Sequence, residues 1–183
     1  MRRQRARRIA KWAMGVFTAH GLALGALFGL GYRLNITDSM PIGVWRVQTD
    51  AMPARGDAAW ACPPLHESVR FAVKVGYLRP GFCPGGVVPV LKTVVALPGD
   101  YIAVSKGGVV VNDSPVPASA PLPFAQGIIP RAVEGEGIVQ PGEAWLVSTH
   151  NPRSYDSRYF GPVPLKNIVG RATPVFVQEK PHD

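Results

Sequence analysis

The amino-acid sequence predicts a mostly β domain preceded by one N-terminal transmembrane helix. A long apolar segment lies near the N-terminus. After it, short β-branched runs alternate with turns, and the chain has 19 prolines and 20 glycines in all. This second part shows no amphipathic helical period of useful length. Because the chain has 183 residues, we expect one domain with appendages rather than two full cores.

The apolar segment, residues 12–32, contains no acidic or basic residue apart from His20. At roughly 1.5 Å per residue, its about 21 residues match a hydrocarbon core about 30 Å thick. A cleaved secretory leader is the alternative, but it would need a small-x-small cleavage site after a short apolar run. The end of this run, from Leu30 to Leu34, has no such site. A transmembrane anchor is therefore favoured.

Positive charge is concentrated ahead of the anchor. Six of the basic residues behind the formal net charge of +8 lie in residues 1–11, namely Arg2, Arg3, Arg5, Arg7, Arg8 and Lys11. The positive-inside rule predicts that residues 1–11 form a cytoplasmic tail, and that residues 33–183 lie in the periplasm beside a bacterial inner membrane. A nucleic-acid-binding protein would carry such charge across its folded part, so no nucleic acid is predicted as a partner.

Within the anchor, Gly21, Gly25 and Gly29 recur every four residues. This spacing places them on one smooth stripe of a helix, against which a second transmembrane helix could pack closely. The rest of the anchor is expected to contact membrane lipid.

The two cysteines, Cys62 and Cys83, form an even pair in a domain predicted to be exported. An oxidising compartment favours a disulfide between them. A metal site that includes His66 is the alternative, but no fourth ligand stands at a recognisable spacing. We expect neither a metal nor another cofactor.

Turn residues separate the candidate strands of the β domain. Lys106-Gly107-Gly108 predicts a hairpin, and Leu97-Pro98-Gly99-Asp100 predicts a turn. Two stretches look irregular, residues 63–86 between the cysteines and residues 115–137. The predicted strands are residues 43–47, 57–61, 87–97, 101–105, 109–112, 144–148 and 168–177.

Two residues suggest chemistry. Ser39 follows residue 32 so closely that it cannot lie more than about 25 Å from the membrane. Lys92 falls in an apolar strand on the same face as Val90 and Val94. If that face is buried, desolvation lowers the pKa of the amine, and a neutral lysine can activate a serine hydroxyl. A lysine that reaches water along its aliphatic stem is the alternative interpretation.

Three segments, taken in order, resemble the conserved boxes of type I signal peptidases. They are Ser39-Met40-Pro41, then Lys92 with Val94-Val95-Ala96-Leu97-Pro98-Gly99-Asp100, then Ser154-Tyr155-Asp156-Ser157-Arg158-Tyr159-Phe160-Gly161. The absence of an inserted residue before Pro41, the cysteine-bracketed stretch and the Asp156–Val163 sequence are similar to the conjugative-transfer type within that family. The resemblance implies a signal-peptidase-like antiparallel β domain with serine peptidase activity.

The resemblance also implies a role for each site residue. Ser39 is expected to be the nucleophile and Lys92 its general base, with Thr37 helping the Ser39 N–H to stabilise the oxyanion. Ser154 is expected to orient the amine of the lysine. Asp156 and Arg158 match the ion pair that supports the lysine in the family.

One segment departs from the family pattern. The usual Gly-Asp-Asn is here Ser148-Thr149-His150-Asn151, which puts the role of the missing acidic residue in doubt. It also brings a histidine close to the site. A triad of Ser39, His150 and Asp156 is therefore conceivable, although it leaves Lys92 unexplained.

The predicted function is processing of a pilin precursor, or of another signal-bearing pre-protein, during conjugative transfer. The acyl-enzyme could pass its acyl group to water or to an amine of the substrate, and the second route would produce a ring. A general housekeeping signal peptidase is one alternative. A non-enzymatic periplasmic scaffold for pilus assembly is the other.

Overall fold

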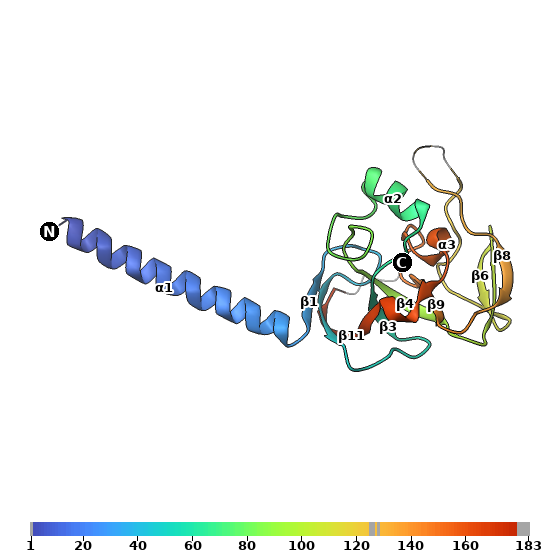
Figure 1. The fold of residues 1–183 in the computed structure, drawn as a ribbon, viewed down its shortest axis with the longest axis horizontal. Coiled ribbons are helices and arrows are strands. Elements are labelled where there is room, and N and C mark those ends of the chain that lie inside the picture. The colour runs from blue at the N-terminus through green and yellow to red at the C-terminus, as the bar shows by residue number, and fades with distance from the viewer. Residues whose placement is uncertain (1, 125–126, 128, 179–183) are drawn as a thin grey trace.

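The computed structural model describes residues 2–124, 127 and 129–178. A long helix, α1 (Arg2–Gly29), projects from a β-rich domain as a separate arm (Figure 1). Its segment Ile9–Gly29 is long and apolar enough to cross a membrane, and none of that segment is buried against the rest of the chain. The helix ends before the predicted anchor boundary at Tyr32, because Gly31 takes a positive φ of 89° and Tyr32 already belongs to a strand.

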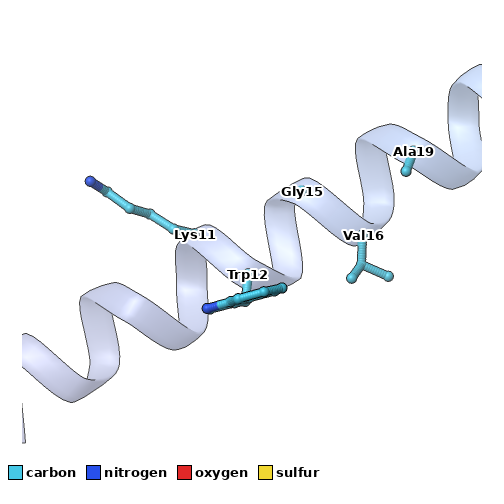
Figure 2. Close-up of a pocket in the computed structure, with 5 residues that line it drawn as sticks. All are labelled: Lys11, Trp12, Gly15, Val16 and Ala19. Atoms are coloured by element: carbon cyan, nitrogen blue, oxygen red, sulfur yellow. The ribbon is translucent and has the colours of Figure 1, made fainter.

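The glycine stripe of α1 is uncovered in the single chain. Apart from the neighbouring backbone of the helix itself, no heavy atom of the described residues lies within 4 Å of the Cβ positions that Gly21, Gly25 and Gly29 lack. A helix partner therefore remains a prediction. Figure 2 shows a hollow on the outside of the same helix, lined by Lys11, Trp12, Gly15, Val16 and Ala19. It lies on the segment expected to be in lipid, so we do not treat it as the functional site.

The larger sheet has seven strands, and its pairings are antiparallel. In spatial order they are β1 (Tyr32–Asn35), β2 (Gly43–Gln48), β11 (Ile168–Val177), β3 (Ala58–Ala61), β4 (Val90–Ala96), β9 (Glu143–Val147) and β10 (Val163–Pro164). This sheet contains the strand of Lys92 and the strand that leads into Ser39.

The smaller sheet has four antiparallel strands. Their order is β7 (Ser114–Pro115), β6 (Gly108–Val111), β5 (Tyr101–Ser105) and β8 (Gly135–Ile138). Both predicted turns are confirmed. Ser105 pairs with Gly108 across the hairpin, and Asp100 N donates to Leu97 O at 3.0 Å across a turn in which Gly99 has a φ of 90°.

The prediction of a mostly β domain behind one apolar helix is confirmed, and all seven predicted strands occur. Several elements are additional, namely β1, β7, β8, β10, α2 (Glu67–Lys74), α3 (Ser157–Phe160) and the 3-10 turn η1 (Leu165–Asn167). The expectation that residues 63–86 are irregular is wrong for α2. This helix starts at an N-cap, His66, whose ring accepts from Ser68 N, and it buries Val69 and Ala72.

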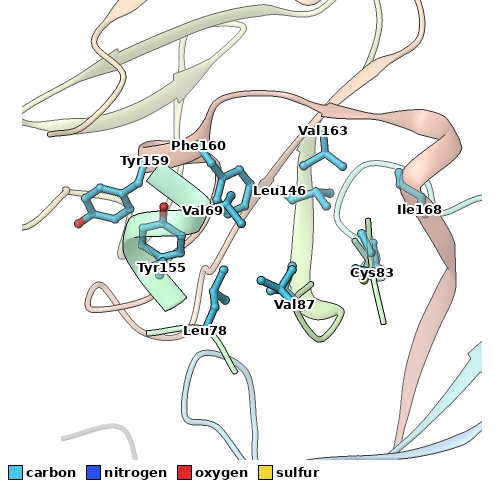
Figure 3. Packing of buried hydrophobic residues seen from close by; sticks show 14 of the residues in the cluster. Val69, Leu78, Cys83, Val87, Leu146, Tyr155, Tyr159, Phe160, Val163 and Ile168 are labelled. Atoms are coloured by element: carbon cyan, nitrogen blue, oxygen red, sulfur yellow. The ribbon is translucent and has the colours of Figure 1, made fainter. Parts of the chain in front are cut away.

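Helix α2 contacts α3, which lies within the last sequence box, and both helices contribute to one buried cluster (Figure 3). Val69 from α2 and Tyr159 and Phe160 from α3 pack with Leu146 of β9 in one buried cluster. A second cluster fills the space between the two sheets, around Trp145. A third, smaller cluster includes Met40, the residue that follows Ser39. Its other buried members are Trp45, Val47, Leu91 and Ala172.

Cys62 and Cys83 are joined by a disulfide, with their Cα atoms 5.5 Å apart. The alternative metal site with His66 is not formed, because bonded sulfurs are no longer thiolate ligands. The disulfide closes the excursion that contains α2.

Replacing both cysteines by serine should lower the free energy of unfolding by about 3 kcal/mol, because the crosslink restricts the unfolded chain over 21 positions. Urea unfolding of the full chain in detergent, followed by tryptophan fluorescence, measures the change. Dithiothreitol should bring the wild type down to the level of the variant and leave the variant unchanged. A double variant as stable as the wild type would contradict this prediction.

Candidate active site

Asn35, the last residue of β1, organises the turn that carries Ser39. Its Nδ2 donates to the carbonyls of Thr37 at 2.9 Å, Met40 at 2.9 Å and Pro41 at 3.0 Å. Its Oδ1 accepts from Thr37 N at 3.2 Å and from Thr37 Oγ1 at 2.9 Å. The side chain is buried, so water does not compete for these bonds. A turn held at five points from one amide has little freedom to change shape.

The Ser39 hydroxyl lies 3.1 Å from Thr37 Oγ1. The single proton of Thr37 is directed to Asn35 Oδ1, which can only accept, so the Ser39 hydroxyl is the donor of the pair. The backbone N–H of Ser39 donates no hydrogen bond in the part of the chain that the structure describes. Ser39 is half-buried, and it therefore combines a hydroxyl with a backbone N–H that no described residue accepts from.

Lys92 lies in β4, a strand whose seven residues are all buried. Only 3% of Lys92 is exposed, and Val90 and Val94 on its face belong to one apolar cluster. Burial lowers the pKa of the amine from 10.5 to about 8, an effect opposed by the negative charge of Asp156 and assisted by the positive charge of Arg158. The lysine therefore does not reach water along its stem, and a substantial fraction of it is neutral at mildly alkaline pH.

The strand register brings the lysine and the serine turn to the same end of the sheet. Thr93 of β4 pairs with Val147 of β9, and one step further along this antiparallel ladder Ser148 comes opposite Lys92. The hydroxyl of Ser148 donates to the backbone carbonyl of Ser39. The hydroxyl of Thr93 lies 3.8 Å from Met40 Sδ and 3.2 Å from Thr149 Oγ1. In the described chain the Ser39 hydroxyl bonds to Thr37 and forms no hydrogen bond to the amine of Lys92.

Asp156 and Arg158 form an ion pair with no exposed surface. Arg158 Nε donates to Asp156 Oδ1 and Arg158 Nη2 donates to Asp156 Oδ2, both at 2.8 Å, which is the bidentate geometry. Arg158 N adds a bond of 3.2 Å to Oδ1, and Ser148 N adds one of 3.0 Å to Oδ2. All the directions in which the carboxylate accepts are thus occupied.

The rest of the Arg158 guanidinium holds two loops. It donates to the carbonyls of Pro152 and Ser154 at 3.0 and 2.9 Å, and to that of Ala120 at 3.1 Å. Ser154 is buried, and its hydroxyl has no hydrogen-bond partner among the residues that the structure describes. Three residues are expected near Lys92. Asp156 and Arg158 bond to each other, whereas the hydroxyl of Ser154 has no bond to another described residue.

The geometry does not support a triad. The carboxylate of Asp156 is filled by Arg158 and Ser148, so it is not available to orient an imidazole. The backbone N–H of His150 donates to Ser148 Oγ at 3.2 Å. His150 therefore belongs to the loop through its main chain.

Sequence reasoning missed the connections made by Asn35, Ser148 and Asn151. Asn35 lies four positions before Ser39, yet a lone asparagine beside a strand gives no local signal that its side chain forms five hydrogen bonds. Ser148 and Asn151 were noted only as a departure from the family pattern. Their partners are more than 100 residues away along the chain, so only the folded chain reveals them.

Residues 9–177 match the family model described as signal peptidase, peptidase S26. The chain belongs to the signal peptidase S26 family. This confirms the resemblance read from the three sequence boxes, and the antiparallel β fold behind one apolar helix agrees with it. A serine peptidase family and a protein substrate follow from this membership. The N-terminal helix fits a single-pass membrane anchor.

Relatives of this S26 family member connect it with conjugal transfer. It is 44% identical to "Probable conjugal transfer protein TraF" of Sinorhizobium fredii (strain NBRC 101917 / NGR234), over 86% of this chain and 83% of the relative. It is 40% identical to "Conjugal transfer protein TraF" of Agrobacterium fabrum (strain C58 / ATCC 33970), over 85% and 88%. A "Plasmid transfer protein TraF" of Escherichia coli is 33% identical, again over 85% and 88%. These similarities support a signal-peptidase-like role in conjugal transfer.

Arg158→Met should lower the free energy of unfolding by about 3–5 kcal/mol, because it leaves the Asp156 carboxylate buried without its charge partner. Adding Asp156→Asn to this variant should recover part of the loss. The matched control is Arg55→Met, whose half-exposed guanidinium pairs with Asp100 and should contribute no more than about 1 kcal/mol. Urea unfolding compares the four proteins, and equal losses for Arg158→Met and Arg55→Met would refute the argument.

Proposed function

We propose that this S26 family member is a membrane-anchored serine endopeptidase in which Ser39 is the nucleophile and Lys92 the general base. Its substrate is a pilin precursor, or another signal-bearing pre-protein, of a conjugative-transfer system. The observation that carries the proposal is the buried amine of Lys92, with its pKa lowered to about 8, at the sheet end where Ser148 holds the Ser39 turn. A charged surface lysine could not serve this role.

In the first step, the hydroxyl of Ser39 turns from Thr37 towards the amine, and the neutral Lys92 accepts its proton. The serine oxygen then attacks the scissile carbonyl. The oxyanion forms beside Ser39 N–H and the Thr37 hydroxyl. Thr37 loses its contact with the Ser39 hydroxyl when that hydroxyl turns towards Lys92. The Asn35 hub fixes the backbone of this turn through the carbonyls of Thr37 and Met40, so Ser39 N–H needs little reorientation when the charge develops. The Thr37 hydroxyl must turn its proton from Asn35 Oδ1 towards the oxyanion before it can donate.

Collapse of this intermediate breaks the peptide bond, and the ammonium of Lys92 returns its proton to the leaving amine. The acyl group on Ser39 then passes to an acceptor, whose proton Lys92 takes in turn. Water as acceptor gives hydrolysis. The free amine of the same substrate as acceptor gives a ring, since a neutral lysine can deprotonate an amine in the same position.

Ser154, Asp156 and Arg158 support the base in this proposal. The hydroxyl of Ser154, which has no partner in the described part of the chain, is available to orient the amine of Lys92. The charges of Asp156 and Arg158 act on the pKa of Lys92, and the hydrogen bonds of Arg158 hold the loop that contains Ser154. Residues 33–183 would work in the periplasm, with the anchor in the lipid of the bacterial inner membrane and its glycine stripe free to bind a second helix.

Ser39→Ala and Lys92→Ala should each reduce cleavage of a pre-pilin at least about 10³-fold, because each removes a reacting group. His150→Ala should keep full activity. Reconstituted full-length protein and mass spectrometry of the products provide the measurement, and they also distinguish a linear product from a ring lacking one water. Cleavage that survives in both variants, or no cleavage by the wild type, would favour a scaffold. Broad cleavage of unrelated pre-proteins would favour a housekeeping peptidase.

The pH dependence tests the base separately. Below its pKa the lysine is protonated and cannot accept a proton, so kcat/KM should rise with pH through an acidic limb near pH 8. Asp38→Asn should move this limb to lower pH, because the Asp38 carboxylate raises the pKa of Lys92. Asp50→Asn is the matched control at an exposed position and should leave the limb in place. A limb near pH 6.5, the ordinary pKa of histidine, would assign the base elsewhere.

A further inference from the structure

The side chain of Asn151 reaches from the 148–151 loop to the residue just before the nucleophile. Its Nδ2 donates to Asp38 O at 3.3 Å and to Asp38 Oδ2 at 2.8 Å. Its Oδ1 accepts from Arg153 N at 2.9 Å. Both oxygens of Asp38 can only accept and Arg153 N can only donate, so the partners fix the orientation of the carboxamide. Asn151 is only 8% exposed, which protects these bonds from water.

This contact acts on the peptide group that carries the Ser39 N–H. The carbonyl of Asp38 and the N–H of Ser39 belong to one planar trans peptide and point in opposite directions. A donor that holds the carbonyl on one side therefore fixes the direction of the N–H on the other. That N–H has no partner in the described chain, so it is free to receive a ligand.

The next peptide group is held from the same loop. Ser148 Oγ donates to the carbonyl of Ser39, and the same oxygen accepts from Asn151 N at 3.0 Å. Two consecutive peptide planes around the nucleophile are thus fixed by two residues of one loop. Ser148 N is bonded in turn to Asp156, which connects this clamp to the buried ion pair.

We infer that Asn151 is a positioning residue that aims the Ser39 N–H at the oxyanion of the acyl-transfer reaction. The inference rests on the proposed function, because it needs Ser39 to be the nucleophile. It assigns the carboxamide of Asn151 a part in stabilising the transition state through the main chain of Asp38, without contact with the substrate. The alternative is that Asn151 only ties two loops together.

Asn151→Asp separates these two explanations. The aspartate keeps the size of the side chain and can still accept from Arg153 N, but it cannot donate to Asp38. At a pH above the acidic limb, we expect kcat to fall roughly 10- to 100-fold while KM stays within about 2-fold. This loss is smaller than that for deleting an oxyanion donor, because the N–H remains but is less well directed.

Asp38→Asn combined with Asn151→Asp provides the second comparison. It restores a carboxamide–carboxylate pair between the loops with the direction of donation reversed, and it leaves the carbonyl of residue 38 without its donor. Thermal stability should recover in this double variant, whereas kcat should not. Asn167→Asp, the same change on η1, is the matched control and should leave the plateau kcat unchanged.

The probes are a fluorogenic peptide with alanine before the cleaved bond and a peptide aldehyde ending in alanine. The aldehyde forms a hemiacetal oxygen on Ser39, so its inhibition constant should rise in proportion to the loss of kcat/KM in Asn151→Asp. Recovery of kcat together with stability in the double variant would overturn the inference, as would an unchanged kcat in Asn151→Asp. Absence of Ser39-dependent turnover in the wild type would instead overturn the proposed function.

Discussion

The candidate site depends on one buried ion pair. Removing two charges from water costs several kcal/mol each, and their attraction repays this only where the other donors and acceptors are also satisfied. Asp156 and Arg158 meet that condition, since the carboxylate has four donors and the guanidinium spreads its N–H groups over the carboxylate and several loop carbonyls. The loop from residue 148 to residue 158 has little freedom left. Through Ser148, this order extends to the nucleophile turn.

The same pair limits how far the pKa of Lys92 can fall. Burial alone favours the neutral amine, whereas the Asp156 carboxylate favours the ammonium. A lone buried aspartate would therefore oppose a neutral base. Arg158 offsets much of that negative charge and itself disfavours the ammonium. An ion pair can thus support a lysine base where a single carboxylate in the same place would keep it protonated.

The fold was predictable because the sequence of each central strand contains a local pattern that indicates a strand. Period and turn chemistry predict β4 and the hairpin after Ser105, and the three boxes predict the family and the candidate residues of the site. The short edge strands were missed, since β7 and β10 contain two residues each and owe their pairing to their neighbours. Helix α2 was hidden by its eight-residue length inside a loop that the disulfide closes. The links from Asn151 and Ser148 to the nucleophile turn cross more than 100 residues, so no local pattern could reveal them.

The junction between α1 and the domain constrains the position of Ser39 relative to the helix. Just after the helix, Gly31 O accepts from Val47 N of β2 at 2.8 Å. Arg33 of β1 donates to Phe28 O, inside the last turn of the helix, at 2.7 Å. The end of the helix is therefore hydrogen-bonded to the first two strands. Strand β1 then runs directly into Asn35 and the turn it holds. Ser39 follows Gly29 by ten positions, which limits their distance to about 35 Å even in a fully extended chain. Because four of the intervening residues are fixed in β1, the distance between Ser39 and the end of the helix is restricted further. Under the proposed function, a substrate must present its cleavage site within that distance.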